Sequence, residues 1–310
     1  MEVVFYFAKF VRCLLCIGLS VLSFNVFASS VGIQDGQLIV APHNELQNAR
    51  SGLSARSSHI EIATKEFVGV VKQPTLVVLI SFEDREISTD LLEWENRIFH
   101  NEYSVSTFFE NNSQGAFQVE PATSTGVVEV TLNTAHPDFG SDYAKSTQLA
   151  NQALLEVAKQ VDLTQFDTNL DKVSDVRELA FVFVGAGFEK SFGGNNASHP
   201  NIWGHQSSST LLVEDYKVSG YVLFGEKHGS RQASIGIICH ELGHLYFNLP
   251  DLYDRDGSSA GAGNWGVMSY GTWGSSGNQL GDRPVNMLAW SRQKIGFLEL
   301  AEPEESKIIT

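Results

Sequence analysis

Cysteine is scarce in this sequence. The 310 residues include three cysteines, and two of them, Cys13 and Cys16, lie in an apolar N-terminal segment. Once that segment is removed, Cys239 stands alone and no internal disulfide can form. The stability of the folded chain must therefore come from core packing, with bound metal ions as a second source. Because neighbours on a helix point in different directions, we interpret Cys239 as a small buried thiol.

Positive charge is also scarce. The chain has 21 Lys and Arg against 36 Asp and Glu, which gives a formal net charge of -15. Nucleic-acid binding relies on clustered Lys and Arg that release counterions from phosphates, so we predict no nucleic-acid partner. With 43% hydrophobic and 18% charged residues, the composition is typical of a globular protein with one large domain, alone or with smaller additions.

The N-terminus carries an apolar run, residues 13–24, that is short for a bilayer span. Lys9 and Arg12 precede this run and the small residue Ala28 follows it, a layout typical of a secretory signal peptide. We therefore predict that residues 1–28 are removed on export, and that the mature protein is secreted, extracellular and without stable membrane insertion. A single membrane anchor is the alternative.

Residues 29–71 are polar and lack sustained periodicity. They predict the propeptide or leader of a zymogen, with Arg50 or Arg56 as processing points, and a flexible extension is the alternative. This stretch contains no cysteine, which excludes a cysteine switch as the means of latency. We predict the compact domain at residues 72–298, and the start of a C-terminal segment at residues 299–310.

Strand-like and helix-like stretches alternate along the compact domain. Apolar β-branched runs and alternating patterns predict strands, whereas apolar residues at helical spacing predict helices. This order predicts an α/β or α+β fold, and the Gly-, Ser- and Asn-rich residues 254–281 predict a loop. The predicted strands span residues 74–82, 115–122, 126–133, 178–187 and 216–226, and the predicted helices span residues 91–109, 142–161, 231–248 and 284–297, the last with Pro284 in its first turn.

The helix predicted at residues 231–248 contains His240, Glu241 and His244 in HExxH order. Residues i and i+4 share one helix face, so the two imidazoles converge on one point and Glu241 can reach a water held there by zinc. Zinc prefers neutral imidazole and lowers the pKa of a bound water to about 7. Glu241 would accept a proton from that water and pass it to the leaving amine. The alternative is an amphipathic helix with satisfied core histidines, although a buried His-Glu-His cluster without metal carries a desolvation cost of several kcal/mol.

Histidine is absent after His244, and glutamate is absent from there until Glu299. A catalytic zinc normally has three protein ligands and one open position, so a third ligand must be found elsewhere. Asn248 tolerates the left-handed conformation that ends a helix, and Pro250 prevents the helix from resuming. The resulting turn favours Asp251 as the third ligand, with Asp254 as second choice. The other candidates are Asp256, Asp282 and the upstream histidines His199, His205 and His228.

The stretch "HELGHLYFNLPDLYD", followed by "GNWGVMSYGTWG", resembles the immune inhibitor A family of secreted bacterial metallopeptidases in the metzincin clan. The likeness covers residues 75–297. It implies a zinc endopeptidase domain with a mixed sheet, an active-site helix and a methionine turn, acting on proteins or peptides. It also implies that Met268 is the turn methionine and that Tyr270 approaches the metal or the developing oxyanion. Asp251 lies seven residues after His244 rather than the clan's usual six.

Residues 167–178 form an acidic stretch with the ligand order of a calcium loop. Oxygen side chains stand at positions 1, 3, 5, 9 and 12, and a backbone carbonyl is available at position 7. Lys172 occupies the place where the sharp turn normally needs glycine, and a solvated acidic loop is the alternative. The candidate calcium ligands are Asp167, Asn169, Asp171, Val173, Asp175 and Glu178.

Together these features favour a secreted zinc endopeptidase that hydrolyses peptide bonds of proteins. The alternative function is a calcium-dependent extracellular binding or adhesion protein that keeps a catalytically silent peptidase fold. The intact HExxH sequence favours the enzyme, because a binding module has no need of a general base.

Overall fold

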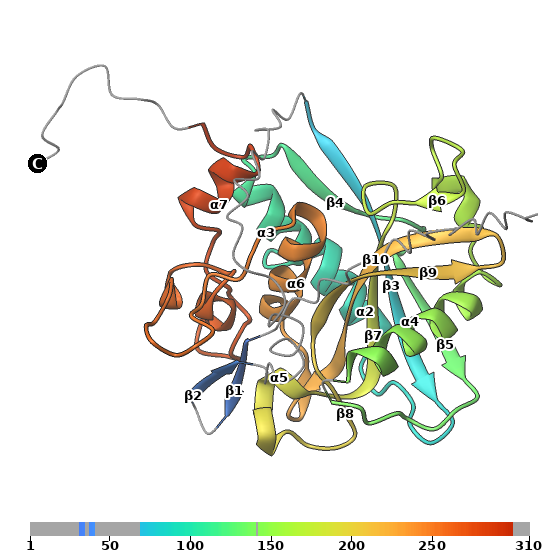
Figure 1. Ribbon diagram of the computed structural model, residues 1–310, viewed down its shortest axis with the longest axis horizontal. Helices are drawn as coiled ribbons and strands as arrows, with labels where there is room; N and C mark the ends of the chain where they lie inside the picture. The colour runs from blue at the N-terminus through green and yellow to red at the C-terminus, as the bar shows by residue number, and fades with distance from the viewer. Residues whose placement is uncertain (1–30, 35–36, 41–68, 141, 300–310) are drawn as a thin grey trace, which may run out of the picture.

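The computed structural model describes residues 31–34, 37–40, 69–140 and 142–299 (Figure 1). The predicted signal peptide, most of the predicted leader and residues 300–310 lie outside these described residues. Within them, no helix combines the length and the apolar character needed to cross a membrane.

A mixed, mostly parallel sheet forms the centre of the domain. Strands β10 (Tyr216–His228), β7 (Ala180–Glu189), β3 (Val71–Phe82) and β4 (Phe117–Pro121) lie side by side in parallel, in that order. Strand β5 (Val127–Leu132) also pairs with β3 in parallel, beyond the end of β4. Strand β9 (His205–Val213) pairs with the other edge of β10 and is antiparallel. The short strands are β6 (Val173–Ser174), β8 (Asn201–Ile202) and β11 (Arg231–Gln232), and a separate hairpin joins β1 (Val31–Gln34) to β2 (Gln37–Val40).

Strand β3 divides the hydrophobic core into two layers. Its residues alternate between faces, as the period of a strand requires, with Val77 and Leu79 in one cluster and Leu76, Val78 and Ile80 in the other. All five side chains are fully buried, which explains why the sequence there is a continuous apolar run.

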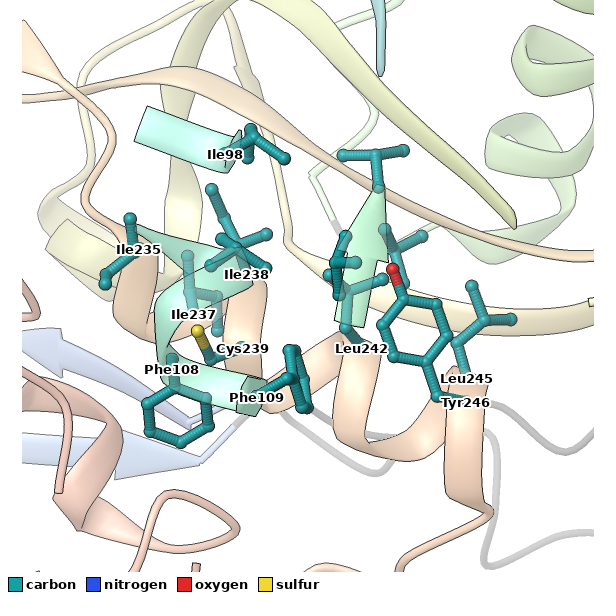
Figure 2. Packing of buried hydrophobic residues seen from close by; sticks show 14 of the residues in the cluster. Ile98, Phe108, Phe109, Ile235, Ile237, Ile238, Cys239, Leu242, Leu245 and Tyr246 are labelled. Carbon is teal, nitrogen blue, oxygen red and sulfur yellow. The ribbon is translucent and has the colours of Figure 1, made fainter. Parts of the chain in front are cut away.

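Helices cover both faces of the sheet (Figure 1). Helix α4 (Tyr143–Val157) packs on one face through Leu149, Ala153 and Leu154, among others. Helices α3 (Val105–Asn112) and α6 (Ile235–Phe247) share the core of the other face, where Phe108 and Phe109 lie against α6 (Figure 2). The remaining helices are short: α2 (Leu91–Glu95), the π-helix η1 (Asn96–His100), η2 (Leu163–Phe166), α5 (Lys190–Gly193), η3 (Gly194–Asn196), η4 (Gly263–Trp265), η5 (Tyr270–Trp273) and α7 (Ala289–Lys294).

The α/β fold class predicted from the sequence is confirmed, but all four predicted helices are too long. The helix expected at residues 142–161 ends at Val157, and the one expected at residues 231–248 begins at Ile235 because Arg231 and Gln232 pair with β10 as strand β11. The helix expected at residues 91–109 is broken into α2, η1 and α3, because Ser104 starts a new helix by accepting a hydrogen bond from the Thr107 N–H at 3.1 Å. The helix expected at residues 284–297 is confined to α7. The residues before α7 instead bond to neighbouring segments, including Val285 N–H to the Gly271 carbonyl at 2.9 Å. Strand β9 was not predicted.

Candidate metal centre and active site

Helix α6 carries the HExxH residues through the middle of the molecule. Every residue from Ile235 to Tyr246 is buried, and the Tyr246 hydroxyl contacts Thr75 of β3 at 2.9 Å. Apolar side chains hold one side of the helix against α3 and the sheet (Figure 2), while His240 and Glu241 are fully buried on the same helix. The helix therefore holds these polar residues out of contact with bulk water.

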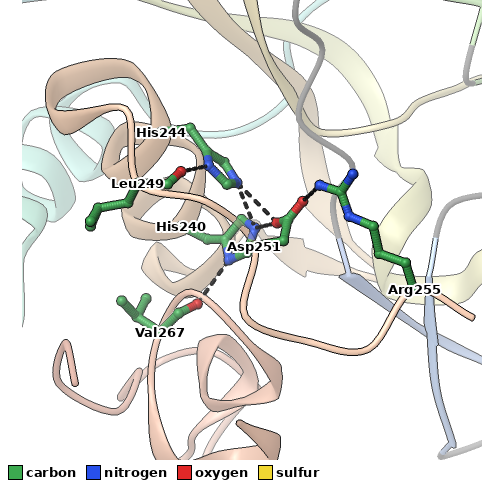
Figure 3. Close-up of polar contacts among 6 residues, drawn as sticks. All are labelled: His240, His244, Leu249, Asp251, Arg255 and Val267. Atoms are coloured by element: carbon green, nitrogen blue, oxygen red, sulfur yellow. Dashed lines mark hydrogen bonds and ion pairs between the residues drawn. The ribbon is translucent and has the colours of Figure 1, made fainter. Parts of the chain in front are cut away.

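Three ligand-type atoms converge at this helix. His240 Nε2, His244 Nε2 and Asp251 Oδ1 are separated by 3.1 to 3.2 Å (Figure 3). A metal ion needs three or more His, Cys, Asp or Glu side chains whose ligand atoms lie close together. Among the described residues, these three side chains meet that condition. Three ligands at 2.0–2.1 Å from a tetrahedral metal would be about 3.3 Å apart, so the triangle fits such an ion.

The two histidine rings are oriented by backbone carbonyls. His240 Nδ1 lies 2.8 Å from the Val267 carbonyl, and His244 Nδ1 lies 2.5 Å from the Leu249 carbonyl (Figure 3). A carbonyl only accepts, so each Nδ1 carries the proton and each Nε2 of a neutral ring presents a lone pair. Two lone pairs and a carboxylate oxygen thus face one another, an arrangement that a cation between them would stabilise. Carbonyls in this outer position are typical partners of metal-binding histidines.

The turn after α6 delivers Asp251 to the histidines. Asn248 ends the helix with a left-handed backbone at φ 52°, and its N–H bonds to the His244 carbonyl at 2.9 Å. The side chain of Asp251 is fully buried, and its second oxygen, Oδ2, lies 2.5 Å from Arg255 Nη2. Burial acts to raise the pKa of Asp251, but its contacts with both histidines hold it below its usual range. Asp251 is therefore an ionised carboxylate.

Glu241 lies beside the triangle with neither carboxylate oxygen hydrogen-bonded to any described residue. Burial raises its pKa to about 8. A buried polar group without partners is costly to the stability of the fold. The unpaired oxygens of Glu241 fit a group that meets water or substrate.

The segment that contains Met268 lies against α6. A Cβ placed on Gly243 would come within 2.6 Å of Met268 Sδ, so glycine at that position permits the close approach. The Met268 carbonyl accepts the Leu252 N–H at 2.7 Å, and the preceding carbonyl, of Val267, is the one that His240 contacts. The segment thus supports both the helix and the turn that bears Asp251.

Two tyrosine rings lie near His240. Tyr253 is nearly parallel to the His240 ring at a centroid distance of 6.3 Å, and to the Tyr270 ring at 6.2 Å. Tyr253 therefore neighbours both rings, and it also hydrogen-bonds to Asp251. Burial and the charge of Asp251 raise the pKa of Tyr253, so its hydroxyl is protonated. Tyr270 itself is half-buried, and no hydrogen bond joins it to the triangle.

The other candidates for a third ligand are engaged elsewhere. Asp254 closes a loop by accepting hydrogen bonds from Asp256, Ser258 and Ser259. The remaining candidates have their own partners: His199 pairs with Asp138, His205 contacts Ser146 and the Trp203 carbonyl, His228 contacts Ser234, Asp256 accepts from Ser258, and Asp282 accepts from Ser276. Of all the candidates, the structure brings Asp251 to the histidines.

The acidic stretch at residues 167–178 is folded by its own side chains. Asp167 accepts the N–H groups of Asp171 and Lys172, Asn169 also accepts from Asp171, and Asp171 accepts the Val173 N–H. Asp175 and Glu178 likewise accept backbone N–H groups within the stretch. Lys172 adopts a positive φ of 64°, the conformation for which calcium loops use glycine. The stretch does not gather three carboxylates within 4.8 Å of one another, and calcium binding there stays a prediction.

Sequence reasoning missed Arg255, Tyr253 and the carbonyls of Val267 and Leu249. Carbonyls have no sequence signature, because every residue has one. Arg255 lies four residues after Asp251, but that spacing has meaning only on a helix, and these residues lie in a loop.

A mixed α/β domain whose buried helix presents His240, Glu241 and His244 beside an aspartate has the architecture of a metallopeptidase catalytic domain. The chain belongs to the immune inhibitor A peptidase M6 family, because the model of that family's catalytic domain matches residues 93–298, about two thirds of the sequence. This confirms the resemblance seen in the sequence and makes the chain a peptidase of a metallopeptidase family, with proteins as its substrates. A search of curated proteins found no match.

Proposed function

We propose that this protein is a secreted zinc-dependent endopeptidase in which His240, His244 and Asp251 hold the metal and Glu241 is the general base. The triangle of His240 Nε2, His244 Nε2 and Asp251 Oδ1 carries the proposal, because its edges of 3.1 to 3.2 Å suit a tetrahedral ion. Nitrogen and carboxylate donors of this kind are typical of catalytic zinc sites with one open position. When bound, zinc would polarise the scissile carbonyl and make water a nucleophile at neutral pH.

Glu241 would handle the proton in this reaction. Its carboxylate oxygens have no hydrogen-bond partner among the described residues. The charge of a bound zinc ion would lower the pKa that burial raises and keep Glu241 ionised, so one oxygen would be available to accept a proton from the attacking water. The same oxygen would then return the proton to the leaving amine. Tyr270 would donate its hydroxyl to the developing oxyanion. The unpaired carboxylate argues against a catalytically silent binding protein, because such a protein would be more stable with Glu241 replaced.

Replacing Glu241 with Gln tests the assignment of the base. The substitution is nearly isosteric and leaves the three metal ligands in place, so the variant should bind zinc with wild-type stoichiometry. Hydrolysis of casein should fall by at least about 10²- to 10⁴-fold, the usual contribution of general acid–base catalysis. A Glu129→Gln variant is the matched control, because Glu129 is an exposed carboxylate on β5, outside the triangle and the turn that bears Asp251.

Full activity in the Glu241→Gln variant would remove Glu241 from the mechanism. If the wild-type protein digested casein equally well after exhaustive treatment with a zinc chelator, zinc-dependent hydrolysis itself would be wrong.

The proposal of secretion rests on the N-terminal segment. It predicts that protein recovered from culture medium begins after residue 28, as N-terminal sequencing would establish.

A further inference from the structure

We propose that Arg255 is a positioning residue that keeps Asp251 a one-oxygen metal ligand. This inference rests on the proposed metal site and deepens it. It assigns a role to a side chain outside the HExxH motif and outside the three ligands.

The two oxygens of Asp251 have separate partners. Oδ1 faces His240 Nε2 at 3.2 Å and His244 Nε2 at 3.1 Å, whereas Oδ2 lies 2.5 Å from Arg255 Nη2 (Figure 3). The carboxylate is fully buried, and the side chain of Arg255 is 35% exposed. The guanidinium thus approaches the ligand from the solvent side, opposite the histidines.

This contact differs from an ordinary surface ion pair. Exposed pairs contribute little because water screens both charges and long side chains lose entropy on pairing. Here the carboxylate is sealed from water, so a charge-assisted hydrogen bond from a planar guanidinium both compensates the charge and fixes the carboxylate plane. Tyr253 also hydrogen-bonds to Asp251, but it is a neutral donor and supplies no charge.

The backbone next to Arg255 is itself held in place. Asp254 accepts the Asp256 N–H at 3.1 Å and the Ser258 hydroxyl at 3.0 Å, and it also accepts the Ser259 N–H. These bonds close a turn that contains Arg255, so the backbone that carries its side chain is held in place. Asp254 therefore supports the metal site through Arg255 without reaching the histidines.

Occupation of Oδ2 has a defined chemical consequence. A free carboxylate can present one or both oxygens to a metal, and the second oxygen would add a fifth ligand to a site with three protein ligands and one open position. A guanidinium on Oδ2 prevents this and leaves the open position for substrate. Outer partners of this kind typically change metal affinity by about 10- to 100-fold when they are lost.

The test uses the full chain freed of metal and reloaded, in wild-type, Arg255→Met and Arg255→Lys forms. Zinc affinity is measured by competition with a chelating dye, and ligand number is measured from the visible spectrum of the cobalt(II)-loaded protein. We expect the zinc dissociation constant of Arg255→Met to rise about 10- to 100-fold, with Arg255→Lys in between. The strong bands of four-coordinate cobalt should weaken in Arg255→Met as the second oxygen enters.

An Arg177→Met variant is the matched control, since Arg177 is exposed and its removal changes the net charge equally. It should match the wild type in both measurements, and thermal melts followed by circular dichroism show that each variant is folded. Wild-type zinc affinity in Arg255→Met, or an unchanged cobalt spectrum, would overturn the role of Arg255 while leaving the peptidase proposal intact. A wild-type protein that neither binds zinc nor hydrolyses casein would instead overturn the proposed function.

Discussion

Two glycines on helix α6 allow the packing around the metal site to be tested quantitatively. A Cβ on Gly236 would lie 1.9 Å from the Thr272 carbonyl oxygen and 3.0 Å from the Gly281 Cα, whereas a Cβ on Gly243 would lie 2.6 Å from Met268 Sδ. The first obstacle is backbone, and the second is the end of a flexible thioether side chain. Alanine should therefore affect the two positions very differently.

The expected magnitudes follow from what can move. At Gly236, the N–H is also bonded to the Gly281 carbonyl at 2.9 Å, so the helix cannot shift without losing that bond as well. Overpacking of this kind costs about 3 kcal/mol or more when the neighbour is rigid. At Gly243, Met268 can change rotamer at a cost of about 1–2 kcal/mol. The higher helix propensity of alanine returns about 1 kcal/mol there, leaving a net change within about 1 kcal/mol.

Urea unfolding followed by circular dichroism measures the difference. The Glu241→Gln background prevents self-digestion from obscuring the transition, and an unchanged m-value verifies that the same two states are compared. The propensity gain applies to both glycines and cancels in the comparison, so Gly236→Ala should be less stable than Gly243→Ala by at least about 1–2 kcal/mol. Equal stability of the two variants would refute the close approach of α6 to Thr272 and Gly281.

Three further expectations concern single carboxylates. Asp251→Ala should lose most of its zinc while Asp282→Ala, which removes a carboxylate bonded to Ser276, retains it, and unchanged zinc stoichiometry in Asp251→Ala would move the third ligand elsewhere. Burial raises the pKa of Glu189 from 4.5 to about 7, against four hydrogen bonds that lower it. The stabilising contribution of protonated Glu189 is complete below pH 4.5 and is lost as the pH rises to 7. The free energy of unfolding of Glu189→Gln should therefore rise relative to that of the wild type by about 3 kcal/mol over that interval. A difference between the two proteins that stays constant with pH would contradict this. Calcium should raise the melting temperature of the wild type and not that of Glu178→Gln, and equal shifts in both would place calcium outside residues 167–178.

The parts of the site that sequence reasoning anticipated depend on local geometry. The separation of His240 and His244 by four residues fixes their common face in any α-helix. Asn248 and Pro250 likewise act on their own backbone, so the end of the helix and the turn after it could be predicted. Asp251 follows that turn directly, and a reversal of the chain direction is sufficient to bring it close to the histidines.

The parts that were missed depend on segments far apart in the sequence. Strand β9 starts with buried polar residues and has no strong strand pattern, and its pairing with β10 decides its conformation. The break at Ser104 and the short helix α7 reflect the same limit. Ser104 is an ordinary helix cap, and it starts a new helix here because the preceding helix η1 has already ended at His100. Met287 N–H bonds to the Asn112 side chain at 2.8 Å, a contact between segments that no local pattern indicates.

The seven-residue spacing between His244 and Asp251 has a physical explanation in these contacts. The Leu249 carbonyl must point back to His244 Nδ1 at 2.5 Å, and Asp251 Oδ1 must reach His244 Nε2 on the opposite side of the same ring at 3.1 Å. One short segment therefore contacts both nitrogens of one imidazole, which requires the chain to pass around the ring. The left-handed Asn248 starts that path and Pro250 keeps it extended. The additional residue lets the same turn orient the ring of His244 and bring Asp251 to it, which supports the proposed set of three ligands.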